Sequence, residues 1–289
     1  MSDWVIGILG GSGLYDLPEA DDGAWLTVAT PWGEPSDQLR RAHLAGTEFV
    51  FLPRHARGHR LPPHRVNARA NIDALKRAGC TDVVSISAVG SFREEIAPGA
   101  FVVADQFIDR TRRDSSFFGE GLIAHVSMAE PVCPRLSALA AAASEAAGVR
   151  TIRGATYIAI EGPQFSTRAE SQLFRDWGAD IIGMTAMPEA KLAREAELPY
   201  ALVGMVTDYD CWRGAEEADV PQMLAQLATN ADHARSLIME FAKSLPAKRE
   251  ASPLDTVLDT ALITPPEARD PDLAAKLDAI CGRAFAAQR

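Results

Sequence analysis

The sequence predicts an α/β protein, a single domain in which helices flank a central, twisted mixed sheet. Short runs of aliphatic and β-branched residues alternate along the chain with longer segments of helical periodicity. Several short runs are almost entirely Val, Ile and Leu, as expected of strands that helices cover on both faces. No internal repeat or long linker divides the 289 residues, so we expect one domain over 1–289, with a helical segment at about 250–289.

Six segments are expected to be strands, because each is a short apolar run rich in β-branched, aliphatic or aromatic residues. In chain order they are residues 4–9, 48–52, 82–89, 100–107, 179–184 and 200–206. Their lengths are those of ordinary strands in globular proteins.

Helical patterns fill the intervals between these runs. Residues 68–75 carry apolar side chains three or four positions apart and are followed by Gly79, a residue type that commonly ends helices. Residues 133–149 have proline near the start and glycine near the end, the usual asymmetry of a helix. An apolar stripe over 220–245 predicts a long helix, and a last helix is expected at 273–284 after a proline-rich turn.

Composition limits the class of protein. The net charge of −10 gives a surface field that repels nucleic acid and anionic lipid, so neither is an expected partner. No apolar stretch reaches the roughly eighteen residues of a membrane span, and Val5–Leu9 is too short for the core of a signal peptide. The four cysteines lie far apart, which argues against a zinc site and a disulfide framework. We therefore expect a cytoplasmic enzyme with free thiols and no metal.

The loops that follow the strands are the candidate site, because ligands of such sheets bind beyond the carboxyl ends of the strands. The first loop, GILGGSGLYD (7–16), sets three glycines around Ser12 and lets backbone N–H groups approach an anion. It does not match the dinucleotide-binding fingerprint, whose third glycine would fall on Asp16. On these residues alone, a tight turn explains the glycines equally well.

The loop RHARGHRLPPHR (54–65) is a positive island in an acidic chain. It holds four arginines and three of the six histidines, and it contains no acid. Such a cluster after a strand suits a doubly charged anion such as phosphate, with Arg54 and His55 nearest the strand end. For the other three arginines, a solvated loop that pairs with surface acids is the alternative.

Four further segments place polar, aromatic or acidic residues at strand ends or before helices. They are SISAVGSF (85–92), EGPQFSTRAES (161–171), GMTAMPEA (183–190) and TDYDCW (207–212). Core packing is the alternative explanation for Phe165 and Met184, and a turn that caps a helix is the alternative for Asp208 and Asp210.

Together these motifs resemble the trimeric purine nucleoside phosphorylases. The resemblance runs from residue 5 to about 245 and rests on five motifs in fixed order: GILGGSGL, RHARGH, ISAVGS, IEGPQFSTRAES with GMTAMPEA, and TDYDCW. Within that family, DQFIDRT (105–111), MAEP (128–131) and TDYDCW are similar to the branch that acts on 5′-deoxy-5′-methylthioadenosine.

The resemblance implies a nucleoside-phosphorylase-like fold and a homotrimer. It implies phosphorolysis of 5′-methylthioadenosine to adenine and 5-methylthioribose 1-phosphate, in purine and methionine salvage. The partners are then a small-molecule nucleoside and inorganic phosphate, which is a co-substrate. No metal or organic cofactor is implied.

The family's functional residues fall on particular positions of this chain. By similarity, phosphate is held by Ser12, Arg54, His55, Ser87 with the backbone N–H of Ala88, and Thr185. The resemblance places the ribose on Met184, the base on Phe165, Ser166, Asp208 and Asp210, and the 5′ group on Val220, Leu224 and His125 of a neighbouring subunit. Asp208 is the implied general acid, because burial favours the protonated carboxyl that can donate to purine N7. Pro221 departs from the family pattern.

Three alternatives involve different chemistry. A phosphorylase of 6-oxopurines, such as methylthioinosine or inosine, would need a hydrogen-bond donor opposite O6, where this chain has Asp208. A hydrolytic methylthioadenosine nucleosidase would have no use for the cluster at Arg54 and His55. A dinucleotide-binding oxidoreductase is disfavoured by the broken glycine fingerprint.

Overall fold

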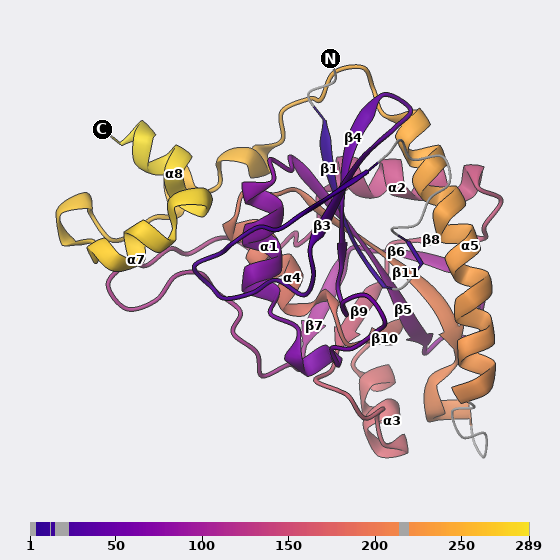
Figure 1. Cartoon of the computed structure of the whole chain (residues 1–289). Helices are drawn as coiled ribbons and strands as arrows, with labels where there is room; N and C mark the ends of the chain where they lie inside the picture. Colours follow the sequence, from indigo (N-terminus) through magenta and orange to yellow (C-terminus); the bar gives the residue numbers. More distant parts are fainter. Residues whose placement is uncertain (1–3, 12, 15–22, 214–219, 289) are drawn as a thin grey trace.

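The structure is a computed structural model that describes residues 4–11, 13–14, 23–213 and 220–288. In this part of the chain eleven strands form one mixed sheet, with helices on both of its faces (Figure 1). The predicted α/β fold class is therefore confirmed.

The strands are β1 (Val5–Gly10), β2 (Ala24–Leu26), β3 (Leu39–Leu44), β4 (Thr47–Pro53), β5 (Asp82–Ser91), β6 (Phe101–Ala104), β7 (Gln106–Asp109), β8 (Thr151–Arg153), β9 (Thr156–Ala159), β10 (Ile181–Gly183) and β11 (Tyr200–Asp208). Along one path the order is β2-β3-β4-β1-β5-β10-β9-β7, and β11 branches from β5 to pair with β6, which pairs with β8. The neighbours β4, β1, β5 and β11 are parallel, so their carboxyl ends meet at one edge of the sheet.

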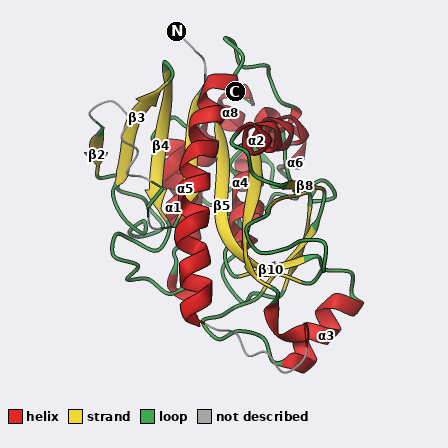
Figure 2. Cartoon of the chain, turned by 90° about the vertical axis from the view of Figure 1, so that its right-hand side faces the viewer, coloured by secondary structure: helices red, strands yellow, loops and turns green. Residues whose placement is uncertain are grey.

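The α-helices are α1 (Ala68–Arg77), α2 (Pro134–Ala146), α3 (Arg168–Asp176), α4 (Ala186–Glu195), α5 (Val220–Ser244), α6 (Leu258–Ala261), α7 (Pro271–Lys276) and α8 (Asp278–Ala287). Short 3₁₀ segments are η1 (Pro63–Arg65), η2 (Asp210–Arg213), η3 (Pro253–Thr256) and η4 (Pro266–Ala268). Helices α2 and α5 pack together over one face of the sheet, and α1 and α4 cover the other, with α8 against α1 (Figures 1 and 2).

Two apolar layers hold these helices to the sheet. The layer under α1 and α4 includes Leu75 and Leu192, and the layer under α2 and α5 includes Leu136 and Phe241. The first eight residues of β11 are all buried. Burial on both faces explains why this strand has a continuous apolar sequence instead of an alternating one.

All six expected strand segments form strands, and two of the expected elements, one strand and one helix, differ in detail. The segment 100–107 is divided between β6 and β7, because the chain changes neighbours at Asp105: β6 pairs with β11 and β8, whereas β7 pairs with β9. The expected last helix is two helices, α7 and α8, which meet at Leu277.

The cysteines are free thiols, and three of the four are buried. None of the helices in the described ranges combines the length and the apolar character needed to cross a membrane. Within those same ranges, no group of three or more His, Cys, Asp or Glu side chains is placed to hold a metal ion.

Candidate active site

A cavity of about 580 Å³ lies at the carboxyl ends of the parallel strands. Its walls include Gly11 after β1, Arg54 after β4, Ala88 on β5 and Asp208 at the end of β11. The strand-end loops singled out in the sequence thus meet in one place, as expected for ligand sites of open α/β sheets. The volume is within the usual range for small-molecule sites.

Arg54 stands at one end of this cavity and is almost fully buried. Its backbone N–H donates to Gly10 O at 2.9 Å, which joins the basic loop to the glycine loop. Its Nε donates to Glu189 Oε1 at 2.5 Å, so the buried guanidinium has a carboxylate partner. A buried arginine is stable only with such a partner.

His55 lines the cavity beside Arg54. Its Nδ1 lies 2.9 Å from the carbonyl of Leu61, and because a carbonyl only accepts, Nδ1 carries the proton. Burial, followed by the charge of Arg54, lowers the pKa of His55 to about 4. The ring is therefore neutral at neutral pH, and its Nε2 can accept a hydrogen bond from a protonated oxyanion.

The hydroxyls of Ser87 on β5 and Thr185 after β10 face each other at the same end of the cavity, with Oγ and Oγ1 2.9 Å apart. The backbone N–H of Thr185 donates to the hydroxyl of buried Tyr157 at 3.3 Å. Ala88, next along β5, also lines the cavity and is exposed to it. Two hydroxyls and an arginine at one end form a set of donors suited to a phosphate.

Asp208 lies elsewhere in the cavity wall, half-buried at the end of β11. Its Oδ1 accepts the backbone N–H of Asp210 at 2.8 Å, and its Oδ2 lies 2.6 Å from Thr207 Oγ1. That hydroxyl is also 3.2 Å from the carbonyl of Val89. Burial, the largest influence on this carboxyl, raises the pKa of Asp208. The hydrogen bonds donated by Thr207 and by the backbone N–H of Asp210 lower the pKa but do not cancel this rise.

Asp210 and Ser166 stand beside Asp208 in the cavity wall. Asp210 Oδ2 accepts the hydroxyl of Ser171 on α3 at 2.5 Å, and burial raises the pKa of its carboxyl. The Ser166 hydroxyl is buried and has no partner among the described residues, so it is available to a ligand. Phe165 also lines the cavity with 53% of its surface exposed, so it is not a core residue.

An apolar stretch of the wall comes from α5 and the glycine loop: Met223, Leu224, Leu227 and Leu14. Leu224 is among the predicted residues, whereas Val220 is placed only as the first residue of α5, and its side chain is outside the description. Ser12 also lies outside the described residues. His125 is exposed and does not line the cavity within this chain.

The basic loop divides into two parts. Arg54, His55 and His59 line the cavity, but the other three arginines do not. Arg57 pairs with Asp37 at 2.8 Å and lies over the ring of Trp25. The alternative of a surface arginine paired with an acid is therefore confirmed for Arg57.

Several supporting residues were not predicted from the sequence: Glu189, Tyr157, Thr207, Ser171 and Arg113. Arg113 donates to the carbonyls of Met184 and Glu161, at 2.8 and 2.6 Å, and so fixes the loop behind the cavity wall. No local signal marks Glu189, because Met187 (φ −112°, ψ 134°) interrupts the helix between Thr185 and Glu189, and their spacing of four does not place them on one helical face.

The family description "Phosphorylase superfamily" matches residues 5–243 of the chain. With that match over most of its length, the chain belongs to the phosphorylase superfamily. Within the superfamily it groups with proteins named S-methyl-5′-thioadenosine phosphorylase. One, from Bradyrhizobium diazoefficiens, is 57% identical over 98% of this chain and 99% of its own length. Another, from Cereibacter sphaeroides, is 56% identical over 96% of this chain and 98% of its own length.

Solved structures agree with this grouping. The crystal structure of a methylthioadenosine phosphorylase from an antarctic soil metagenomic library is 45% identical, covers 96% of this chain and 98% of its own, and has a TM-score of 0.92. The methylthioadenosine phosphorylase of Schistosoma mansoni in complex with adenine is 32% identical, covers 96% of this chain and 98% of its own, and has a TM-score of 0.80.

Proposed function

We propose that the chain catalyses phosphorolysis of 5′-methylthioadenosine, giving adenine and 5-methylthioribose 1-phosphate. One observation carries the proposal: a single cavity has a buried arginine with paired hydroxyls in one part of its wall and two half-buried carboxyls in another. The names of the closely related proteins support the choice of nucleoside. Purine and methionine salvage is the metabolic role we assign to it.

The donors at the first end place phosphate beneath C1′ of the ribose. Arg54, His55, Ser87, Thr185 and the backbone N–H of Ala88 hold the anion, together with Ser12. Positioning of this kind turns a reaction between two molecules into one within a complex, which removes much of the entropic barrier. Inorganic phosphate is a co-substrate in this scheme, and we propose no metal or organic cofactor.

The part of the cavity wall that carries Asp208 and Asp210 assists departure of the base. As the bond to C1′ stretches, negative charge develops on the purine, and a protonated Asp208 donates to N7. Asp210 and Ser166 hold the amino edge of adenine, and Phe165 covers a face of the ring. Met184, whose carbonyl is fixed by Arg113, contacts the ribose. The methylthio group then lies against Leu224 and its apolar neighbours on α5, with Val220 near the start of that helix.

We further propose a cytoplasmic homotrimer of single-domain subunits. The apolar side chain of Leu224 is 60% exposed at the cavity, as is 53% of Phe165, although both would contact the substrate. A neighbouring subunit that covers this side, and brings its own His125 near the 5′ group, would remove both from water. Light scattering coupled to size-exclusion chromatography would test the trimer, and a monomer of about 31 kDa with full activity would contradict it.

A spectrophotometric assay of four nucleosides, each with and without phosphate, tests the activity. We expect methylthioadenosine to be cleaved rapidly only with phosphate, adenosine more slowly, and methylthioinosine and inosine least. Release of adenine without phosphate would indicate a nucleosidase. Faster cleavage of the two 6-oxopurines would indicate the other phosphorylase class.

A further inference from the structure

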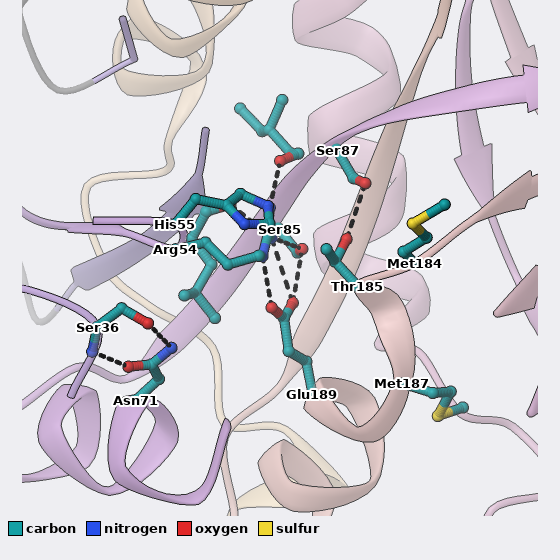
Figure 3. A network of polar contacts seen from close by, with 12 residues as sticks. Ser36, Arg54, His55, Asn71, Ser85, Ser87, Met184, Thr185, Met187 and Glu189 are labelled. Carbon is teal, nitrogen blue, oxygen red and sulfur yellow. Dashed lines mark hydrogen bonds and ion pairs between the residues drawn. The ribbon is translucent and has the colours of Figure 1, made fainter. Parts of the chain in front are cut away.

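A buried network centred on Glu189 lies beneath the arginine end of the cavity (Figure 3). Glu189 belongs to α4, whereas its partners come from the loop after β4, from β5 and from β11. Its Oε1 accepts Arg54 Nε at 2.5 Å, and its Oε2 accepts the hydroxyls of Ser85 and Tyr200 at 3.0 and 3.3 Å. Both carboxylate oxygens are thus fully engaged, although Glu189 does not line the cavity.

The hydrogen bonds of Arg54 leave little of its guanidinium free. Nε donates to Glu189, Nη2 donates to Leu9 O at 3.0 Å and Ser85 Oγ at 2.6 Å, and Nη1 donates to Ile86 O at 3.0 Å. A guanidinium has five N–H groups, so four have partners in the protein. Among the described residues, the remaining N–H on Nη1 has no acceptor, and Arg54 lines the cavity.

We propose that Glu189 is the positioning residue of the phosphate end: it holds the Arg54 guanidinium in the one orientation that leaves a single N–H of Nη1 for the anion. This inference rests on the proposed phosphorolysis. Among the described ion pairs, Glu189 is the only carboxylate on Arg54, and it accepts from Nε at 2.5 Å and from Nη2 at 3.3 Å, away from the free N–H on Nη1. Without Glu189 the guanidinium keeps only its bonds to Leu9 O, Ile86 O and Ser85 Oγ. The orientation of its Nε side must then be fixed when the anion binds, which lowers the affinity for the anion.

Glu189→Gln tests the proposal, because glutamine keeps the size of the side chain and removes its charge. We expect the dissociation constant for phosphate, measured by calorimetry without nucleoside, to rise about 10- to 100-fold, as expected for loss of a charge-assisted hydrogen bond. The KM for phosphate should rise in parallel. The KM for methylthioadenosine at saturating phosphate should change by less than about threefold.

Asp82→Asn is the matched control. Asp82 is fully buried near the opposite end of β5 and pairs with Arg135 and Arg249, each at 2.5 Å, but it does not line the cavity. Both variants weaken a buried ion pair and should lower the melting temperature. Only Glu189→Gln should raise the dissociation constant and the KM for phosphate.

Ser85→Ala keeps the test decisive if Glu189→Gln does not fold. It removes one hydroxyl that contacts both Arg54 and Glu189, and we expect a smaller rise in the phosphate dissociation constant, about 3- to 10-fold. Unchanged phosphate binding in a folded variant would overturn the role of Glu189, even if stability fell. Failure of the wild-type chain to bind phosphate at all would instead overturn the proposed function.

Discussion

The protonation state of Asp208 decides whether the residue can act as proposed. Burial raises its pKa, and this effect outweighs the hydrogen bonds from Thr207 and Asp210, which lower it. A raised pKa means that the acid form persists to higher pH, and that activity falls as pH rises through it. The same carboxyl, fully ionised and turned to solvent, could not assist a purine leaving group.

Asp208→Asn tests this role directly. Asparagine resembles the neutral carboxyl in shape, so we expect little loss in the free energy of unfolding, about 1 kcal/mol or less. Turnover of methylthioadenosine should fall by about 10²–10⁴-fold, because the amide can donate a hydrogen bond to N7 but cannot transfer a proton to it. Steady-state kinetics and urea denaturation of the same preparations compare the two effects, and turnover near that of the wild type would remove the acid role.

His55 links stability to pH and to phosphate. Its pKa is about 4 in the folded chain, against an ordinary value near 6.5. Between these two pH values the imidazole is protonated in the unfolded chain and neutral in the folded chain. The contribution of His55 to the free energy of unfolding is therefore complete above about pH 6.5. It declines as the pH falls toward 4, by about 3 kcal/mol at most. Bound phosphate should offset the loss, because an anion beside the ring favours its charged form.

Urea denaturation at pH 5, 6, 7 and 8, with and without phosphate, measures this linkage, and His55→Gln is the reference protein. The difference between the two proteins isolates the imidazole from other titrating groups, such as Glu195, whose pKa burial raises to about 7. Stability that falls equally in both proteins on acidification would contradict the assignment.

At the scale of elements, the sequence was most informative where secondary structure is decided locally. Strands β1 and β11 are almost continuous apolar runs, and β5 is rich in Val and Ile between its serines, so their positions were predictable. β3 was missed because its sequence, LRRAHL, includes two arginines and lacks β-branched residues, so only its pairing with β2 and β4 makes it a strand.

The candidate site likewise contains residues that the sequence could predict and residues that only the tertiary structure brings into place. Residues at strand ends, such as Arg54 and Asp208, could be predicted because the sheet itself brings strand ends together. Glu189 could not, because a glutamate on a helix is ordinarily exposed. Its burial depends on Arg54, which is 135 positions away in the chain. Pairings of that kind are fixed by the tertiary structure and have no local signal.

Strand β5 approaches the end of β11 closely at Gly90. A Cβ atom built there would lie 3.0 Å from Asp208 Oδ1 and 3.1 Å from Ile182 Cγ2. We therefore expect Gly90→Ala to displace the carboxyl and to reduce kcat at least about tenfold, since small displacements of a catalytic group are costly. Gly119→Ala is the control, because a Cβ at Gly119 meets no atom within 4 Å. Equal kcat values for the two variants would show that Asp208 tolerates the added methyl group.

At the scale of the whole molecule, the C-terminal segment is part of the main apolar layer. The family match ends at residue 243, yet Leu258, Leu277 and Ile280 are buried in the same cluster as Leu75 of α1. Ion pairs strengthen the attachment: Arg283 bonds to buried Glu197 at 2.6 Å. The helices of the segment pack behind α1, and none of their residues lines the cavity. Its role is therefore to complete the core.

Leu277→Ala separates stability from catalysis on that basis. Truncation of a fully buried leucine removes apolar contacts and leaves a cavity, so we expect the free energy of unfolding to fall by about 2–5 kcal/mol. The KM values for methylthioadenosine and phosphate should stay at wild-type levels in the folded fraction, because Leu277 does not line the site. Leu273→Ala, at a partly buried position on α7, should cost less. Denaturation curves and steady-state kinetics provide both measurements, and a changed KM for either substrate would mean that the segment also shapes the site.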